Sequence, residues 1–170
     1  MTNKEFFIQC WQNEMKTTAR AVRALPADMN KLDYKPSEKG RNARQIIEHI
    51  LPHAEYLSKA IDTGIMDEQD HKFSSIEEAA SYTEKQSALF IEKLSKVDDK
   101  IWDTKVIPLM IHGNKIFEAP MYSFFWSYLF DVIHHRGQLS TYYRPMGVRN
   151  PSIYGPTQED IEERMAATKN

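Results

Sequence analysis

The chain has 170 residues, the usual length of one domain, and it can bury a core without disulfide or metal cross-links. Its 22 Lys and Arg against 24 Asp and Glu give a net charge of -2, which offers no broad cationic field to a nucleic-acid backbone. No segment approaches about 18 continuous apolar residues, the N-terminus lacks a signal-peptide pattern, and the single Cys10 cannot form an internal disulfide. We therefore expect one cytoplasmic domain over residues 1–170, with neither nucleic acid nor membrane as a partner.

The first half of the chain predicts two amphipathic helices. Apolar residues at spacings of three and four indicate a helix over residues 5–25, and a polar, turn-rich connector follows over 25–42. A second helix is predicted over residues 42–64. Pro52 removes a backbone donor inside it, so we expect a kink near His49. Such a kink can make room for a site, and a plain tolerated bend is the alternative.

The middle of the chain predicts a third helix and then an extended segment. A glutamate follows three residues after Ser74 and another three residues after Ser75, a spacing that resembles a capping box. A helix should therefore begin there and continue to about residue 98. Alternating apolar residues over 101–120, with a His-Gly-Asn turn signal at 112–114, predict a short hairpin or crossover. Pro108 argues against a central strand here.

The most apolar helix is predicted between Pro120 and Pro145, and its apolar residues on most faces place it centrally. The tail beyond Gly147 is polar, and Thr157 can cap a short helix that packs outside the core. Four long helical patterns joined by connectors of unequal length predict an all-α four-helix bundle with one or two crossover connections.

Asp131 and His135 are four residues apart in this helix, so they share one face and can bind the same ion. Sites in helical bundles recruit further ligands from a facing helix, and His49 is our first choice there. His53, one turn later, is assigned to the second shell or the rim. A carboxylate among Phe130 and its apolar neighbours would also need a positive partner if it were buried.

Several neighbours of this pair have alternative interpretations. Arg136 could neutralise Asp131 or Glu48 in a purely structural network. His134 points about a hundred degrees away from His135 and should not bind the same ion. Gly137 costs a helix about 1 kcal/mol, which predicts a close helix crossing, or a ligand, at that position.

Three stretches resemble the DinB/YfiT-like superfamily. HHRGQLSTYYRPMG, His134 to Gly147, followed by PSIYGPT, Pro151 to Thr157, is similar to its C-terminal signature. RQIIEHI, Arg44 to Ile50, resembles the segment of its second helix that donates a metal histidine.

The resemblance implies a four-helix bundle with a crossover connection, a divalent metal bound by three histidines, and frequently a homodimer. By position, the resemblance assigns the metal ligands to His49, Asp131 and His135. Asp131 stands at a position where many members of the superfamily have histidine. Zinc or nickel are the first candidates, and iron and manganese accept the same donors.

Two functions follow as expectations. The first is a metal-dependent transferase or hydrolase that acts on a small molecule, with a low-molecular-weight thiol as a second substrate, and in which His53, Gln138 or Tyr142 orients the substrate. The alternative is a non-enzymatic stress-response or regulatory dimer whose metal is structural or absent. A plain bundle in which Arg136 pairs with Asp131 is a third interpretation.

Overall fold

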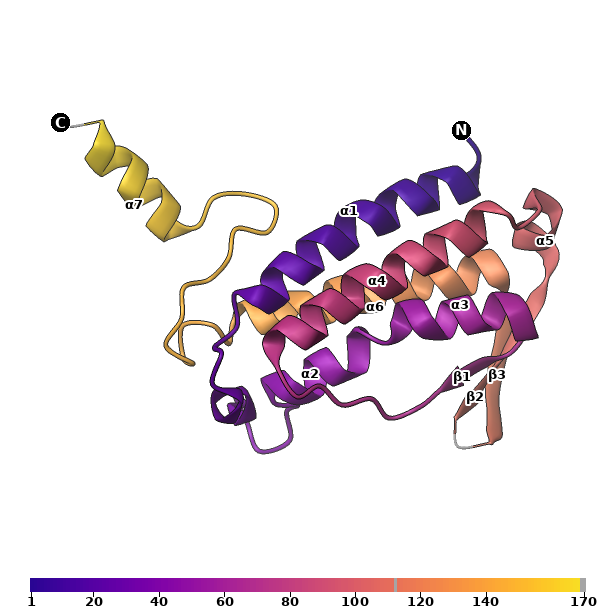
Figure 1. Cartoon of the computed structure of the whole chain (residues 1–170), viewed down its shortest axis with the longest axis horizontal. Helices are drawn as coiled ribbons and strands as arrows, with labels where there is room; N and C mark the ends of the chain where they lie inside the picture. The colour runs from indigo at the N-terminus through magenta and orange to yellow at the C-terminus, as the bar shows by residue number, and fades with distance from the viewer. Residues whose placement is uncertain (112, 169–170) are drawn as a thin grey trace.

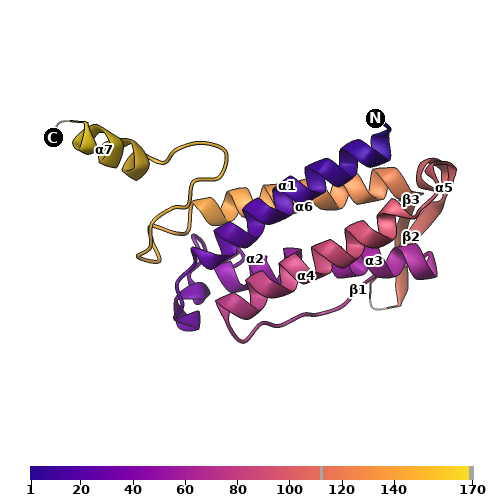
Figure 2. The same cartoon turned by 45° about the horizontal axis from the view of Figure 1, so that its top comes forward.

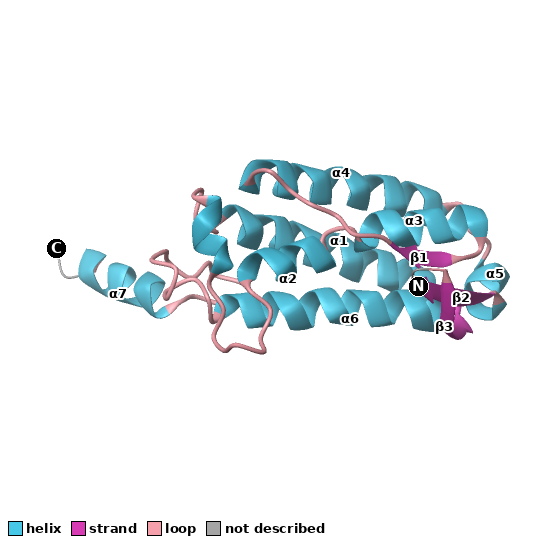
Figure 3. Ribbon diagram, turned by 90° about the horizontal axis from the view of Figure 1, so that it is seen from below, coloured by secondary structure: helices cyan, strands magenta, loops and turns pink. Residues whose placement is uncertain are grey.

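The computed structural model, which describes residues 1–111 and 113–168, is mostly helical with a small sheet at one end of the helical body (Figure 1). Helices α1, α4 and α6 lie lengthwise beside one another, and α2 and α3 follow each other along the remaining side (Figure 3). None of the helices in the described residues is long and apolar enough to span a membrane. The helices are α1 (Asn3–Arg23), η1 (Met29–Asp33), α2 (Ala43–Ile50), α3 (His53–Thr63), α4 (Ile76–Ser95), α5 (Asp99–Thr104), α6 (Met121–Ser140) and α7 (Gln158–Ala167).

Aromatic side chains from α1, α4, α5 and α6 form the centre of the core. The rings of Trp11 and Phe90 lie 4.8 Å apart, and those of Phe7 and Trp102 lie 5.2 Å apart. The indole Nε1 of Trp11 donates to Ser87 Oγ at 3.0 Å, so its one polar group is satisfied in the interior. Burial of these rings fixes how α1 and α4 sit against α6.

The predicted second helix is two helices. α2 ends at Ile50 and α3 begins at His53, with Pro52 between them. Pro52 has no N–H to continue the ladder of α2, and its carbonyl instead accepts from Tyr56 as the first hydrogen bond of α3. The sequence predicted a kink, and the structure interrupts the helix there, although Leu51 and Pro52 keep right-handed helical dihedrals.

The hairpin predicted before the fourth helix is present as β2 (Val106–Ile111) and β3 (Asn114–Pro120), while the predicted turn residue His112 lies outside the described residues. β1 (Met66–Glu68), which the sequence analysis left in a connector, pairs parallel with β2 and makes β2 the central strand. The expectation from Pro108 was therefore wrong. Pairing with β1 starts only at Leu109, so Pro108 has a strand neighbour on the β3 side alone.

The C-terminal helix α7 projects away from the helical body (Figures 1 and 2). Thr157 caps it as predicted, and none of its residues is buried. The preceding loop is attached to the body through Tyr154, whose hydroxyl donates to Glu14 Oε2 at 2.6 Å.

Candidate metal centre

The break at Pro52 positions two imidazoles opposite α6. His49 lies in the last turn of α2 and His53 in the first turn of α3, and both rings face the middle of α6, where Asp131 lies. Residues four apart in helical backbone share one face, as Asp131 and His135 do on α6. His49 and His53 keep this relation across Pro52, and both reach the same carboxylate oxygen.

The three side chains converge closely. His49 Nε2 lies 3.1 Å and His53 Nε2 lies 3.0 Å from Asp131 Oδ2, and one ligand atom from each residue lies within 4.8 Å of the others. His135 contacts the second carboxylate oxygen, with its Nε2 3.3 Å from Asp131 Oδ1. The rings of His49 and His135 are 5.0 Å apart. Four of the residues considered in the sequence analysis are thus brought together.

This donor set fits a divalent metal ion. Zinc binds imidazole nitrogen and carboxylate oxygen at about 2.0–2.2 Å, so neighbouring ligand atoms lie roughly 3.4 Å apart in a tetrahedral site and roughly 3 Å apart in an octahedral one. The separations of 3.1 Å and 3.0 Å from Asp131 Oδ2 fall at the short end of that range, which is also the length of a hydrogen bond. Imidazole with carboxylate also suits nickel, iron and manganese. The residues therefore form a possible metal site, and the identity of the metal is left open by the donors.

The surroundings of His135 favour a cation at the same place. Its Nδ1 lies 2.8 Å from Gln138 Oε1, which only accepts, and its Nε2 lies 3.3 Å from the guanidinium of Arg41, which only donates. Those partners suit a neutral ring with the proton on Nδ1, whereas the contact of Nε2 with Asp131 Oδ1 at 3.3 Å suits a proton on Nε2. A positive charge between Nε2 and the carboxylate, either a proton or a metal ion, makes that contact favourable.

The carboxylate and the histidines shift one another's pKa. Partial burial of Asp131 would raise its pKa, but hydrogen bonds from His135, His49 and His53 outweigh it and hold the pKa well below the usual range. The contact with Asp131 raises the pKa of His135, while burial lowers the pKa of His53. Asp131 thus stays ionised and His53 favours its neutral, ligating form.

Asp131 is less buried than the sequence suggested. Its side chain is 36 % exposed, and the neighbouring Phe130 is 60 % exposed, because both face away from the core at this turn of α6. The carboxylate is partly hydrated, so the energetic argument for a positive partner is weaker than expected. The clustering of imidazoles around it is the stronger evidence for the site.

The sequence analysis assigned His53 to the second shell or the rim of the site, but the structure buries its side chain. Its side chain is 1 % exposed and packs against Tyr128, with the two rings 4.7 Å apart. Its Nδ1 is buried and finds no hydrogen-bond partner within residues 1–111 and 113–168. The ring is therefore oriented by packing and by its Nε2 contact.

Arg136 does not neutralise Asp131 or Glu48. The guanidinium is buried against α1, where it pairs with Glu14 Oε2 at 2.5 Å and donates to Thr18 Oγ1 at 3.0 Å. It projects from the face of α6 opposite the histidines, which excludes the interpretation in which Arg136 holds Asp131.

The remaining candidates lie at the edge of the site. His134 is exposed and lies 3.0 Å from Gln138 Nε2, so it contacts a neighbour of the site and not the carboxylate. The hydroxyl of Tyr142 donates to the carbonyl of Arg41 at 3.0 Å. A Cβ added to Gly137 would meet nothing within 4 Å, so the predicted close helix crossing is wrong.

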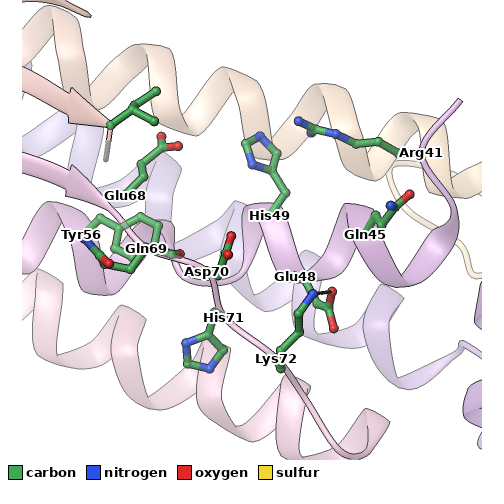
Figure 4. Close-up of a pocket in the computed structure, with 11 residues that line it drawn as sticks. Arg41, Gln45, Glu48, His49, Tyr56, Glu68, Gln69, Asp70, His71 and Lys72 are labelled. Carbon is green, nitrogen blue, oxygen red and sulfur yellow. Dashed lines mark hydrogen bonds and ion pairs between the residues drawn. The ribbon is translucent and has the colours of Figure 1, made fainter. Parts of the chain in front are cut away.

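Two site residues were missed in the sequence, Arg41 and Glu68. Arg41 precedes α2, and Glu68 belongs to β1, so each sits in a segment that reads as a polar connector. Both line a cavity of about 280 Å³ beside His49 (Figure 4). No local spacing links them to the histidines, because only the parallel pairing of β1 with β2 brings Glu68 to this side of α6.

The fold and the site together define a helical protein with a candidate metal centre between α2, α3 and α6. The model of the DinB family matches residues 1–166, and the chain belongs to this family, as its C-terminal motif predicted. No curated protein sequence gives a significant match.

Two solved structures share the fold. A DinB-like protein from Bacillus cereus ATCC 10987 is similar at 22% identity with a TM-score of 0.68, over 88% of this chain and 97% of that one. A DinB-like protein from Bacillus subtilis is similar at 15% identity with a TM-score of 0.64, over 88% and 99% of the two chains.

Proposed function

We propose that the protein is a metal-dependent enzyme, a transferase or hydrolase that acts on a small molecule. The observation that carries the proposal is the convergence of His49, His53 and Asp131 beside a cavity of about 280 Å³. Structural metal sites are closed by protein ligands, whereas catalytic sites keep a position open to water or substrate. A ligand cluster that borders a cavity favours the second kind.

The proposed ligands are His49, Asp131 and His135, and His53 completes the set or takes the place of one of them. When bound, a divalent ion lowers the pKa of a coordinated water or thiol and stabilises an anion. Gln138 accepts from Nδ1 of His135 and so keeps Nε2 free to ligate. Zinc or nickel are the first metals to test, then iron and manganese.

A low-molecular-weight thiol is the proposed second substrate. The support is the resemblance of the C-terminal motif to relatives that use such thiols, together with a cavity of small-molecule size. His53, Gln138 and Tyr142 line or border the site and are the proposed orienting groups. We also infer that α2 and α3 together fill one position of a four-helix bundle, with α1, α4 and α6 as the others.

Elemental analysis of untagged protein tests the site. We expect about one metal per chain, lost in Asp131→Ala and in His49→Ala. His71→Ala is the control for metal content alone, because this imidazole lines the cavity but packs against Phe73 and Tyr82 outside the ligand cluster. Assays of the loaded protein against a panel of thiols and electrophiles then test turnover. An unchanged metal ratio in Asp131→Ala would remove the site, and absence of turnover across the panel would remove the enzyme.

A non-enzymatic stress-response or regulatory homodimer is the second candidate. An apolar groove of about 430 Å³ between α1 and α6 supports it, and Phe6 and Phe130 on its edges are 46 % and 60 % exposed. Exposed aromatic patches of this kind mark association surfaces. Sedimentation of wild type and Phe130→Ser tests whether this groove mediates association. A wild type that is monomeric at all concentrations would exclude the dimer.

A further inference from the structure

The cavity beside His49 carries opposite charges at its two ends. Figure 4 shows the guanidinium of Arg41 and the carboxylate of Glu68 pointing toward His49 from opposite sides. His49 is one of the candidate metal ligands, so the two charges flank the site along the length of the cavity. A second charged pair in the cavity, Lys72 with Glu48, forms an ion pair at 2.8 Å.

Arg41 is held at both its backbone and its side chain, but its charge is not neutralised. The backbone carbonyl accepts from the Tyr142 hydroxyl at 3.0 Å, and the guanidinium Nη1 lies 3.3 Å from His135 Nε2. No carboxylate of the described chain forms an ion pair with it. A guanidinium has five N–H donors in a planar fork, so most of them stay available to an anionic group.

Glu68 is the matching anion at the other end. The hydroxyl of Tyr128 donates to its Oε1 at 2.5 Å, and the backbone of Glu68 pairs with Ile111 in the sheet. In the described part of the chain, no Lys or Arg forms an ion pair with this carboxylate. Asp70 lines the same cavity and adds negative charge near that end. The second oxygen of Glu68 can therefore accept from a ligand's ammonium group.

We propose that this cavity binds a zwitterion, with its anionic group on Arg41, its ammonium group on Glu68 and its chain across His49. A ligand with one charge would leave the opposite end of the cavity uncompensated, whereas a zwitterion satisfies both ends. The inference rests on the proposed function only in taking this cavity as the substrate site.

The experiment compares three probes of equal chain length by titration calorimetry. They are 6-aminohexanoate, hexanoate and hexylamine, and 4-aminobutyrate and 8-aminooctanoate then test the span between the charges. We expect the best ω-amino acid to bind about tenfold more tightly than either singly charged probe, because each charge-assisted contact contributes at roughly that level. We expect the same order of affinities in chelator-treated protein, because neither Arg41 nor Glu68 needs a metal to bind its charged group.

Two variants test which end of the cavity binds each charge of the ligand. Arg41→Gln should cost the zwitterion about tenfold and leave hexylamine unchanged, whereas Glu68→Gln should cost the zwitterion about tenfold and leave hexanoate unchanged. Glutamine at position 68 can still accept from Tyr128. Arg164→Gln and Glu162→Gln are matched controls on α7, which projects away from the cavity (Figure 1).

Two outcomes would overturn the inference: a singly charged probe that binds as tightly as every ω-amino acid, or a zwitterion preference that survives both Arg41→Gln and Glu68→Gln. The metal-to-chain ratio tests the proposed metal site independently of these binding measurements. Selective zwitterion binding by protein that never retains metal would support this inference while removing the proposed enzyme.

Discussion

His53 Nε2 lies 3.0 Å from Asp131 Oδ2, although the two residues are 78 positions apart in the chain. The contact joins the start of α3 to the middle of α6 and buries the His53 ring almost completely. One side of the ring faces the carboxylate, and the other side carries an Nδ1 without a partner in the described residues. The ring therefore makes one polar contact, with the carboxylate, and it lacks the second partner that usually orients a ligating imidazole.

The first prediction is that His53→Leu lowers metal content without loss of fold. Leucine fills the buried space, and it removes an unpaired Nδ1 whose burial costs about 1–3 kcal/mol. We expect a lower metal-to-chain ratio, with the chelator-treated variant within about 1 kcal/mol of wild type in urea unfolding. A full metal ratio would leave His49, Asp131 and His135 as the complete ligand set.

A second prediction concerns Gln138, which accepts from Nδ1 of His135 at 2.8 Å. Partners of this kind fix the tautomer of a ligating imidazole, and their loss typically costs 10–100-fold in metal affinity. Gln138→Leu should weaken the metal by about that factor in chelator competition. Gln158→Leu on α7 serves as control, because its side chain is exposed and donates to Glu162 on the same helix. Equal affinity in both variants would mean that His135 is not a ligand.

Sequence patterns were most informative for site residues that lie within a single helix. The spacing of Asp131 and His135 placed both on one face of α6, and the apolar surroundings of His49 directed it to the same interface. The caps at Ser75 and Thr157 were also readable, because their side chains accept from backbone N–H groups a few residues on. Local patterns therefore predicted the long helices and directed His49, Asp131 and His135 to one region, and they missed η1 and α5.

Non-local geometry explains what was missed. Pro52 predicted an irregularity in the helix, but the sequence did not show that His53, just beyond it, is buried against Asp131. Arg136 and Asp131 are five apart on one helix, and the periodicity alone did not show that Arg136 faces Glu14 on α1. Glu68 reaches the site through a strand of three residues that pairs with a segment about forty residues later.

A third prediction tests the separation of Arg136 from the metal site. Arg136 is 2 % exposed and is paired with Glu14, so Arg136→Met would leave a carboxylate without its partner. Removing one member of a buried pair typically costs about 3–5 kcal/mol. Because Glu14 is 18 % exposed, we expect the lower end, about 3 kcal/mol in urea unfolding, with unchanged metal content. Loss of metal from a folded Arg136→Met variant would contradict this assignment.

The fourth prediction is a pH dependence carried by Glu55, which links α3 to α4. Burial would raise its pKa, but hydrogen bonds from Lys59 and Tyr82 outweigh it and lower the pKa from the ordinary 4.5. A folded-state pKa below the unfolded value stabilises the protein above pH 4.5, and that contribution is lost as the pH falls through the folded pKa.

Glu55→Gln should therefore cost about 1 kcal/mol in urea unfolding at pH 7, below the roughly 1.5–3 kcal/mol of buried hydrogen bonds to a charged group, because the side chain is 25 % exposed. The difference between the variant and wild type should shrink as the pH falls below 4.5 and through the folded pKa. Glu162→Gln on α7 is the control and should follow wild type at both pH values. A difference that stays constant between pH 7 and pH 3 would show that the Glu55 charge contributes nothing.

The last prediction concerns Gly137, which lies in α6 one turn before its end and borders the hollow around His135. An added Cβ would meet nothing within 4 Å, so alanine fits without displacing a neighbour. Glycine inside a helix costs about 0.5–1 kcal/mol relative to alanine. Gly137→Ala should stabilise the protein by that amount in thermal or urea unfolding with metal content unchanged. If it stabilises the fold yet weakens binding of a small-molecule substrate, the open space beside Gly137 is occupied by that substrate.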